Sequence, residues 1–206
     1  MAQTHIGYTA WNDPPADVMP PLVRGADLAS VQPAPEPERE PDILQAIPIA
    51  LFKGEGGGRF EWTRVPYLGR WGEAQLALPQ GRPATAPADG VYLEYPLRLT
   101  EAGDYELVVQ LVPTLDTIGD DGLRIGLSLD GGPVRELLVR LEPTNGQADT
   151  PPRAAWVKAV IDNMVELTAR FDGLAAGEHR LRLYRIDDNV VPQAVLVRRT
   201  ETPAVP

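Results

Sequence analysis

The chain has 206 residues, 43% of them hydrophobic, which is enough for one well-packed core and at most one further small unit. Its formal net charge of −10 argues against nucleic acid or an anionic membrane as a partner, because both are bound through a basic surface. The sequence contains no cysteine, which excludes disulfides, thiolate metal sites and cysteine nucleophiles.

Residues 1–8 have neither a basic region nor an apolar run, and no later window approaches the ~20 apolar residues of a membrane-spanning helix. We therefore expect a soluble chain, with any secretion signal outside it. Proline is concentrated in residues 12–48, which hold many of the 22 prolines. Proline cannot donate a ladder hydrogen bond or hold a helix, so this segment should run extended. We predict a Pro-rich arm and linker at 1–45, a folded domain at 46–200 and a disordered tail at 201–206.

Strand patterns begin after the glycine-rich residues 54–58. Residues 91–99 are apolar at every second position, which predicts a strand with one buried face. Asp130-Gly-Gly132 predicts a hairpin turn between two strands. We predict strands at 91–99, 105–112, 123–129, 134–141, 165–171, 180–186 and 194–197.

One helix is predicted between residues 154 and 163, because Trp156, Val160 and Met164 follow each other at intervals of four. The period then changes to two at Val165, which indicates a return to strand. Short strands separated by turns predict an all-β fold, a β-sandwich of jelly-roll or Greek-key type with one short helix.

Catalytic motifs are absent from the sequence. Its two histidines, His5 and His179, are far apart, and its serines are only Ser30 and Ser128, so a Ser-His-Asp triad is not expected. His179 is in phase with a predicted strand, and we favour a hydrogen-bonded structural role for it. Four carboxylates could form a glycosidase pair or bind calcium, although their spacing matches no EF-hand loop and solvated turns are favoured: Asp116, Asp120, Asp121 and Asp130. We predict no catalytic residue, no metal and no cofactor.

Sugar recognition needs aromatic platforms and planar hydrogen-bonding groups. Three aromatic residues gather within ten positions in a region that is predicted to be loop, and three polar residues precede the last strand. Burial of Trp62 and Trp71 at one end of the core is the alternative, and we favour it for each ring. The paired aspartates would repel a glucuronate, so a neutral polysaccharide is the expected ligand. The candidate ligand-binding residues are Trp62, Tyr67, Trp71, Asp187, Asp188 and Asn189.

Residues 177–193 resemble a known family. Gly177-x-His179-x-Leu181, followed by Ile186-Asp187 and Val190-Val191-x-Gln193, is similar to the end of glycoside hydrolase family 115 proteins, the xylan α-1,2-glucuronidases. The family has Pro-Gly where this chain has Asp188-Asn189, which still favours a turn. Further segments resemble the family in the same order along the chain: Gly7-Tyr-Thr-x-Trp11, Pro113-Thr114, Gly122-Leu-Arg124, Ser128-Leu-Asp130 and Trp156 with Asp162-Asn163.

The resemblance implies a non-catalytic C-terminal β-sandwich domain of a bacterial xylan-degrading enzyme, whose active site precedes this region. Its role would be architectural, through docking onto the catalytic domains or contacts between two copies of the chain. The sequence also resembles β-sandwich carbohydrate-binding modules, so a free-standing module for xylan or a related plant polysaccharide is the alternative. A small carboxylate-based enzyme is the third. As part of a xylan-degrading enzyme, the protein would be secreted or periplasmic.

Overall fold

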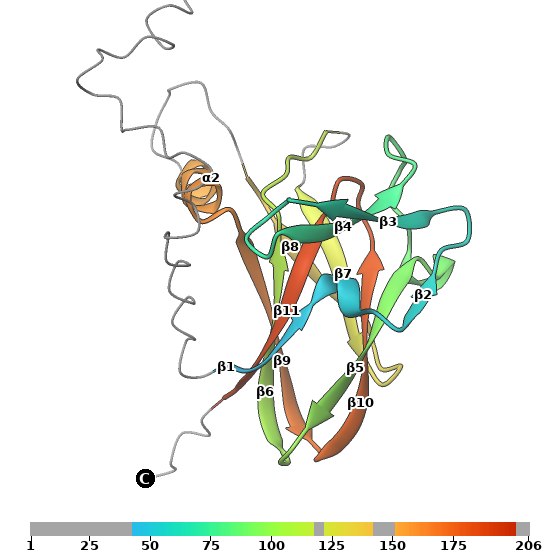
Figure 1. Cartoon of the computed structure of the whole chain (residues 1–206), viewed down its shortest axis with the longest axis vertical. Coiled ribbons are helices and arrows are strands. Elements are labelled where there is room, and N and C mark those ends of the chain that lie inside the picture. The colour runs from blue at the N-terminus through green and yellow to red at the C-terminus, as the bar shows by residue number, and fades with distance from the viewer. Residues whose placement is uncertain (1–42, 118–121, 142–150, 201–206) are drawn as a thin grey trace, which may run out of the picture. The chain divides into compact units, whose positions relative to one another are not determined.

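The computed structural model describes residues 43–117, 122–141 and 151–200. Of the predicted arm at 1–45 only residues 43–45 are described, and the predicted tail at 201–206 lies outside the described residues, as do His5, Asp120 and Asp121. Within the described ranges strands predominate, with one α-helix and two short 3-10 turns, η2 (Ile49–Leu51) and η3 (Pro87–Asp89) (Figure 1).

Two large antiparallel sheets form the sandwich, and a third sheet has only two strands. The four-stranded sheet has the order β1-β11-β6-β9, with bounds Ile43–Pro48, Pro192–Arg199, Gly103–Leu111 and Val165–Leu174. The five-stranded sheet has the order β2-β5-β10-β7-β8, with bounds Gly54–Gly56, Tyr92–Leu99, Gly177–Arg185, Leu123–Leu129 and Arg135–Val139. The chain passes repeatedly between the two sheets, for example from β5 to β6, from β6 to β7 and from β10 to β11 (Figure 1). This arrangement confirms the predicted all-β sandwich.

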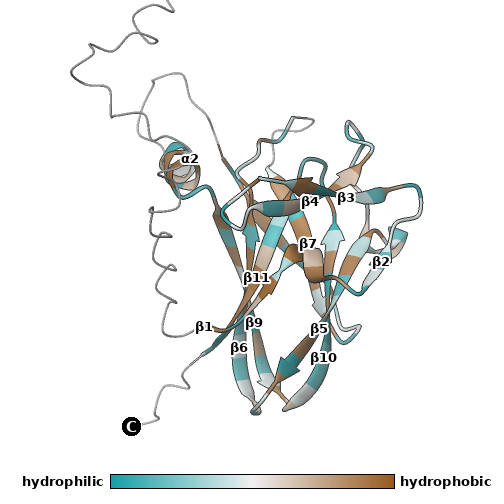
Figure 2. Ribbon diagram, viewed as in Figure 1, coloured by the Kyte–Doolittle hydropathy of each residue, from teal (hydrophilic) through white to brown (hydrophobic). Residues whose placement is uncertain are grey.

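The core lies between the two sheets and follows the alternation of the strands. Leu93, Tyr95 and Leu97 of β5 are fully buried, whereas the residues between them face outward, and Figure 2 shows this change of hydropathy along the strands. The Tyr95 hydroxyl donates a 2.7 Å hydrogen bond to the carbonyl of Ile49, and burial raises the pKa of Tyr95 far above its usual value. The hydrogen bond lets a polar group stay inside the core.

The region around the early aromatic residues, predicted as loop, is a hairpin: the prediction is wrong for Trp62, which lies on a strand, and right for Tyr67 and Trp71, which lie in the turn between the two strands. β3 (Glu61–Pro66) pairs antiparallel with β4 (Glu73–Leu78). The sequence of β4 is rich in alanine and polar residues, which have low strand propensity. Tertiary packing stabilises the strand in spite of this low propensity, because Ala74 of β4 is buried in a small cluster with Val112 and Val191.

The predicted helix at 154–163 is confirmed as α2 (Pro151–Asp162). The residues that predicted it do not form one buried stripe, however. Val160 is exposed, while Ala159 is the only buried side chain among residues 153–162. The helix therefore offers most of its surface to solvent.

Candidate functional site

Three loops meet at one end of the sandwich, and hydrogen bonds join them. They are residues 79–85, 112–117 and 186–191, which we call the loop end. The backbone N–H of Thr85 donates to the carbonyl of Ile186 at 2.8 Å, and the Thr114 hydroxyl donates to the carbonyl of Asn189 at 2.7 Å. The loop that carries the three polar candidates is thus held on two sides.

Asp187 is engaged by Arg124, the residue after the first position of β7. The Arg124 Nε and Nη2 groups donate to the two carboxylate oxygens at 2.8 and 2.9 Å, and the backbone N–H of Arg124 adds a 2.8 Å bond. This two-pronged geometry is the strong form of a charge-assisted pair. The pair occupies both carboxylate oxygens of Asp187, which would otherwise be free to accept hydrogen bonds from sugar hydroxyls.

Asp188 is buried with Arg185, the last residue of β10. The Arg185 Nη2 group donates to Asp188 Oδ1 at 3.0 Å, and the backbone N–H of Gly81 donates to Asp188 Oδ2 at 2.7 Å. Arg185 also donates to the carbonyls of Arg82 and Pro83, and its guanidinium lies 4.3 Å from the centre of the Phe60 ring. The pair therefore fastens β10 to the 79–85 loop.

Asn189 holds a left-handed backbone conformation, with φ of 61°, which asparagine tolerates better than most residues. Its side-chain amide donates to the carbonyl of Leu115 at 2.7 Å, and its amide oxygen accepts a 3.4 Å bond from Gln80. All three polar candidates thus have partners within the chain. A ligand at this loop would have to share or displace these bonds.

Tyr67 and Trp71 lie together in residues 67–72, which join β3 to β4 and which we call the aromatic turn. The Tyr67 side chain is 97% exposed and that of Trp71 is 39% exposed. The Trp71 indole N–H donates to Gln110 Oε1 at 2.6 Å, so one edge of the ring is fixed while much of its surface meets solvent. An exposed, oriented aromatic ring suits stacking on the apolar face of a pyranose.

Trp62, unlike Tyr67 and Trp71, is buried. It lies on β3, is 8% exposed and belongs to the main hydrophobic core. Its ring therefore offers no free face for a sugar, and the structure separates it from the other two aromatic candidates. The reason is the strand register, which turns Trp62 inward.

A groove of about 580 Å³ adjoins the loop end. It is lined by residues 58–61, which lead into the first position of β3, and by residues 78–80, which begin at the last position of β4. Gln80 connects the groove to Asn189 through the 3.4 Å hydrogen bond. Polar and apolar groups therefore meet beside the polar loop, although the aromatic turn is not part of this lining.

His179 has a structural position near the start of β10. Its Nδ1 lies 2.6 Å from Asp130 Oδ2 and its Nε2 lies 2.9 Å from the carbonyl oxygen of Ala175. A carboxylate and a carbonyl both accept, so both ring nitrogens donate, which is the arrangement of a charged imidazolium. The pair links the β7–β8 turn to the β9–β10 turn.

Burial opposes a charge on His179, but the bonds to Asp130 and Ala175 outweigh it and raise the pKa of His179 above 6.5. Burial also acts to raise the pKa of Asp130, yet hydrogen bonds from His179 and from the Arg180 N–H hold it below 3.8. The stabilisation of the folded state by the His179–Asp130 pair is therefore complete between pH 3.8 and pH 6.5. It declines as pH rises through the raised pKa of His179, and as pH falls through the lowered pKa of Asp130.

We expect the difference in urea midpoint between the native chain and His179→Gln to be largest near pH 5 to 6 and to shrink toward pH 9. The effect should be no more than about 1 kcal/mol, because Asp130 is half-exposed. His5→Gln is the matched control and should leave the pH dependence unchanged. A difference that stays constant from pH 5 to pH 9 would show that His179 is not a titrating partner of Asp130.

Residues 43–117, 122–141 and 151–200 contain no group of three or more His, Asp or Glu side chains that could hold a metal ion. Of the four carboxylates considered for a pair, Asp120 and Asp121 lie outside these ranges and Asp130 is bound by His179. No helix within the described ranges is long and apolar enough to cross a membrane.

Gln193 and Gln110 order the aromatic turn, and sequence reasoning missed both. Gln193 Oε1 accepts the backbone N–H groups of Arg70 and Trp71 at 2.7 and 3.4 Å, while its Nε2 donates to the carbonyl of Leu111 at 3.0 Å. Gly69 allows this approach, because a Cβ there would lie 2.4 Å from Gln193 Oε1. The signal available in the sequence was a lone glutamine inside the largely apolar stretch 190–197, and the structure shows Gln193 fully buried.

Comparison with solved structures finds a fold shared with a carbohydrate-active enzyme. A family GH115 4-O-methyl-α-glucuronidase with specificity for decorated arabinogalactans matches with a TM-score of 0.56 and 17% identity, over 77% of this chain and 18% of that one. A family 35 carbohydrate-binding module from Clostridium thermocellum matches with a TM-score of 0.49 and 16% identity, over 75% of this chain and 98% of that one. A family 6 module of a laminarinase from Zobellia galactanivorans has a TM-score of 0.46 and 15% identity, with the same coverages.

The chain thus spans 18% of the length of the glucuronidase that it matches. No curated protein matches it in sequence. A family model does match, over residues 46–204, and it describes the glycosyl hydrolase family 115 C-terminal domain, a non-catalytic part of these enzymes. This match confirms the resemblance drawn from residues 177–193. Because it covers most of the sequence, the chain belongs to the glycosyl hydrolase family 115 C-terminal domain family.

Proposed function

We propose that this accessory domain docks onto other domains of a family 115 enzyme and that α2 supplies the contact. The observation that carries the proposal is the exposed apolar face of α2. Val157, Val160 and Ile161 are 47%, 52% and 77% exposed, and their spacing of three and four residues places them on one side of the helix. Such a face in water lacks the packing that normally stabilises a helix.

The length of α2 supports the same conclusion. A helix of 12 residues is marginal by itself, because most helical stability in proteins comes from packing. Among residues 153–162 only Ala159 is buried. A partner that covered Val157 and Ile161 would supply the missing contacts.

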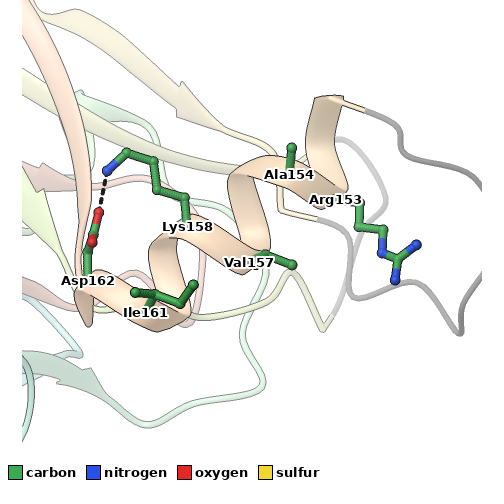
Figure 3. A pocket seen from close by; sticks show the side chains of 6 residues that line it. All are labelled: Arg153, Ala154, Val157, Lys158, Ile161 and Asp162. Atoms are coloured by element: carbon green, nitrogen blue, oxygen red, sulfur yellow. Dashed lines mark hydrogen bonds and ion pairs between the residues drawn. The ribbon is translucent and has the colours of Figure 1, made fainter.

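The surface of α2 also has the composition of an interface. A groove of about 400 Å³ lies along it, and Figure 3 shows the six side chains that line it. Val157 and Ile161 give apolar surface, and Lys158 forms an ion pair with Asp162 beside them. An apolar centre with a polar rim is typical of protein interfaces. The partner that we propose is another domain of the same enzyme, since the matched glucuronidase is far longer than this chain.

Hydrogen exchange of the complete gene product, compared with that of the 206-residue chain, tests this proposal. We expect amides at 153–162 to exchange at least tenfold more slowly in the complete protein, and Ile161→Asp to remove this protection. Leu138→Asp is the matched control, because Leu138 is a 46% exposed apolar residue on β8.

Equal exchange in the two proteins would contradict the proposal, as would a gene that encodes no further domain. Sedimentation of the 206-residue chain tests whether α2 binds a second copy of the chain instead. If the chain dimerises and Ile161→Asp makes it monomeric, the helix binds a second copy and the docking proposal fails.

The second candidate function is contact with a polysaccharide through the aromatic turn. It is favoured by the exposure of Tyr67 and Trp71 and by the hydrogen bonds that hold Trp71 in place. The proposed ligand is a neutral stretch of xylan. Arabinogalactan is a rival, because the matched glucuronidase has specificity for its decorated forms.

A further inference from the structure

The end of α2 lies beside the aromatic turn, although the two are distant in sequence (Figure 1). The helix ends in a Schellman motif. The Met164 N–H donates to the carbonyl of Ala159 at 3.0 Å, and the Asn163 N–H donates to the carbonyl of Val160 at 3.4 Å. Asn163 has the left-handed backbone that this motif requires, with φ of 52°. The motif therefore fixes the direction of the Asn163 carbonyl.

A buried glutamine joins this carbonyl to the aromatic turn. Gln193 Nε2 donates to the carbonyl of Asn163 at 3.3 Å, and Gln193 Oε1 accepts the backbone N–H groups of Arg70 and Trp71. Gln193 is fully buried, so water does not replace these partners. Because its amide group is planar, a rotation of the NH2 group also turns the oxygen. The helix end and the aromatic turn are thus bound to the two ends of one rigid group.

A second buried glutamine makes a parallel link through the ring of Trp71. Gln110 is 4% exposed, and its Oε1 accepts the indole N–H at 2.6 Å. Its Nε2 donates to Glu166 Oε1 at 2.8 Å. Glu166 is the second residue of β9, the strand that α2 leads into. Both the backbone and the side chain of Trp71 are therefore connected to the segment that contains the end of α2.

The helix can supply the motion that these links would transmit. A 12-residue helix with one buried side chain among residues 153–162 exchanges between an ordered and a frayed state. When its last turn frays, the Schellman motif opens and Gln193 loses the Asn163 carbonyl, while it retains that of Leu111. The Gln193 oxygen is then held less firmly toward Arg70 and Trp71.

We propose that α2 and the aromatic turn are conformationally coupled, so that ordering of the helix orders the turn and loosening of either loosens the other. The coupling is a property of the folded chain and needs no ligand. Its use rests on the docking and polysaccharide contact proposed above. A domain that covered Val157 and Ile161 would hold Trp71 in place for stacking, and a sugar on the turn would strengthen docking, because coupling between two sites is reciprocal.

Two glycines of the aromatic turn give a matched test. Gly69 and Gly72 both have φ of 74°, but a Cβ at Gly69 would lie 2.4 Å from Gln193 Oε1, whereas a Cβ at Gly72 would meet nothing within 4 Å. Gly69→Ala and Gly72→Ala impose similar backbone strain, and only the first displaces Gln193. By NMR hydrogen exchange of the 206-residue chain, we expect the Asn163 and Met164 amides to exchange about threefold faster, or more, in Gly69→Ala than in Gly72→Ala.

The opposite direction is tested from the helix. Ile161 is 77% exposed, and Ile161→Gly and Ile161→Ala remove the same contacts, but glycine favours the frayed helix roughly fivefold relative to alanine. We expect the Arg70 and Trp71 amides to exchange about threefold faster, or more, in Ile161→Gly than in Ile161→Ala. The same two substitutions at Leu138, an exposed residue of β8, control for overall stability and should change these rates less than about 1.5-fold.

Three results would overturn the coupling. One is equal exchange of the helix-end amides in the two glycine variants. Another is equal exchange of the Arg70 and Trp71 amides in the two Ile161 variants, or the same acceleration from the Leu138 pair, which would mean that the turn opens only with the whole domain. The third is a complete gene product in which α2 is protected while exchange at Arg70 and Trp71 is unchanged. The variants of the 206-residue chain need no partner, so failure of the docking proposal leaves their outcome intact.

Discussion

The Asp188→Ala variant should lose about 3–5 kcal/mol of unfolding free energy, the largest effect that we expect from a single polar substitution here. The reason is that Arg185 is buried and would lose its anion while remaining charged inside the protein. The backbone N–H of Gly81 would lose its acceptor as well. Urea denaturation followed by tryptophan fluorescence measures the change directly.

Asp187→Ala is the matched control for this substitution. It removes the neighbouring carboxylate, whose partner Arg124 is 41% exposed and can turn to water. We expect a loss of about 1 kcal/mol in this case. Similar losses in the two variants would mean that burial does not govern the Arg185–Asp188 pair. A double-mutant cycle with Arg185→Met should give a coupling of at least ~1 kcal/mol, since the two groups are in contact.

Trp71→Ala should weaken binding of a polysaccharide by at least about tenfold, or ~1.4 kcal/mol, if the aromatic turn is a sugar platform. The ring is partly exposed and its indole N–H is fixed by Gln110, so a sugar could stack on it with little loss of side-chain freedom. Affinity electrophoresis against glucuronoxylan, arabinoxylan and arabinogalactan measures the effect. Tyr67→Ala should act in the same direction.

Trp156→Ala is the control for Trp71→Ala, because Trp156 is a partly buried tryptophan on α2. It should leave retardation on the polysaccharide unchanged, and circular dichroism should show both variants folded. If the native chain is not retarded on any of the three polysaccharides, or if Trp71→Ala is retarded as strongly as the native chain, the aromatic turn is not a binding surface.

The main strands could be predicted from local sequence, because alternation records which side of a strand faces the core. Leu93 and Tyr95 show this on β5, and their partners across the ladder on β10, Leu183 and Leu181, are buried as well. The hairpin of β3 and β4 could not be predicted in the same way. Ala74 and Ala77 have little strand preference, and their burial depends on residues distant in sequence.

The candidate sugar residues show where local pattern stops being informative. Trp62 and Trp71 are the same residue type nine positions apart, yet strand register buries one and the turn exposes the other. The residues near Asp187 in the sequence did not reveal its ion-pair partner, because that partner, Arg124, lies 63 residues earlier. A pattern that describes neighbours in the chain cannot show which polar groups are satisfied by distant ones.

The sequence by itself determined the fold class, the position of the helix and the family, because periodicity and ordered motifs are properties of adjacent residues. Only the tertiary structure decided which side chains remain available to a partner. It engaged Asp187, Asp188 and Asn189 within the chain and left Val157 and Ile161 of α2 exposed. Exposure and pairing follow from how strands stack in space, and this is set by long-range packing.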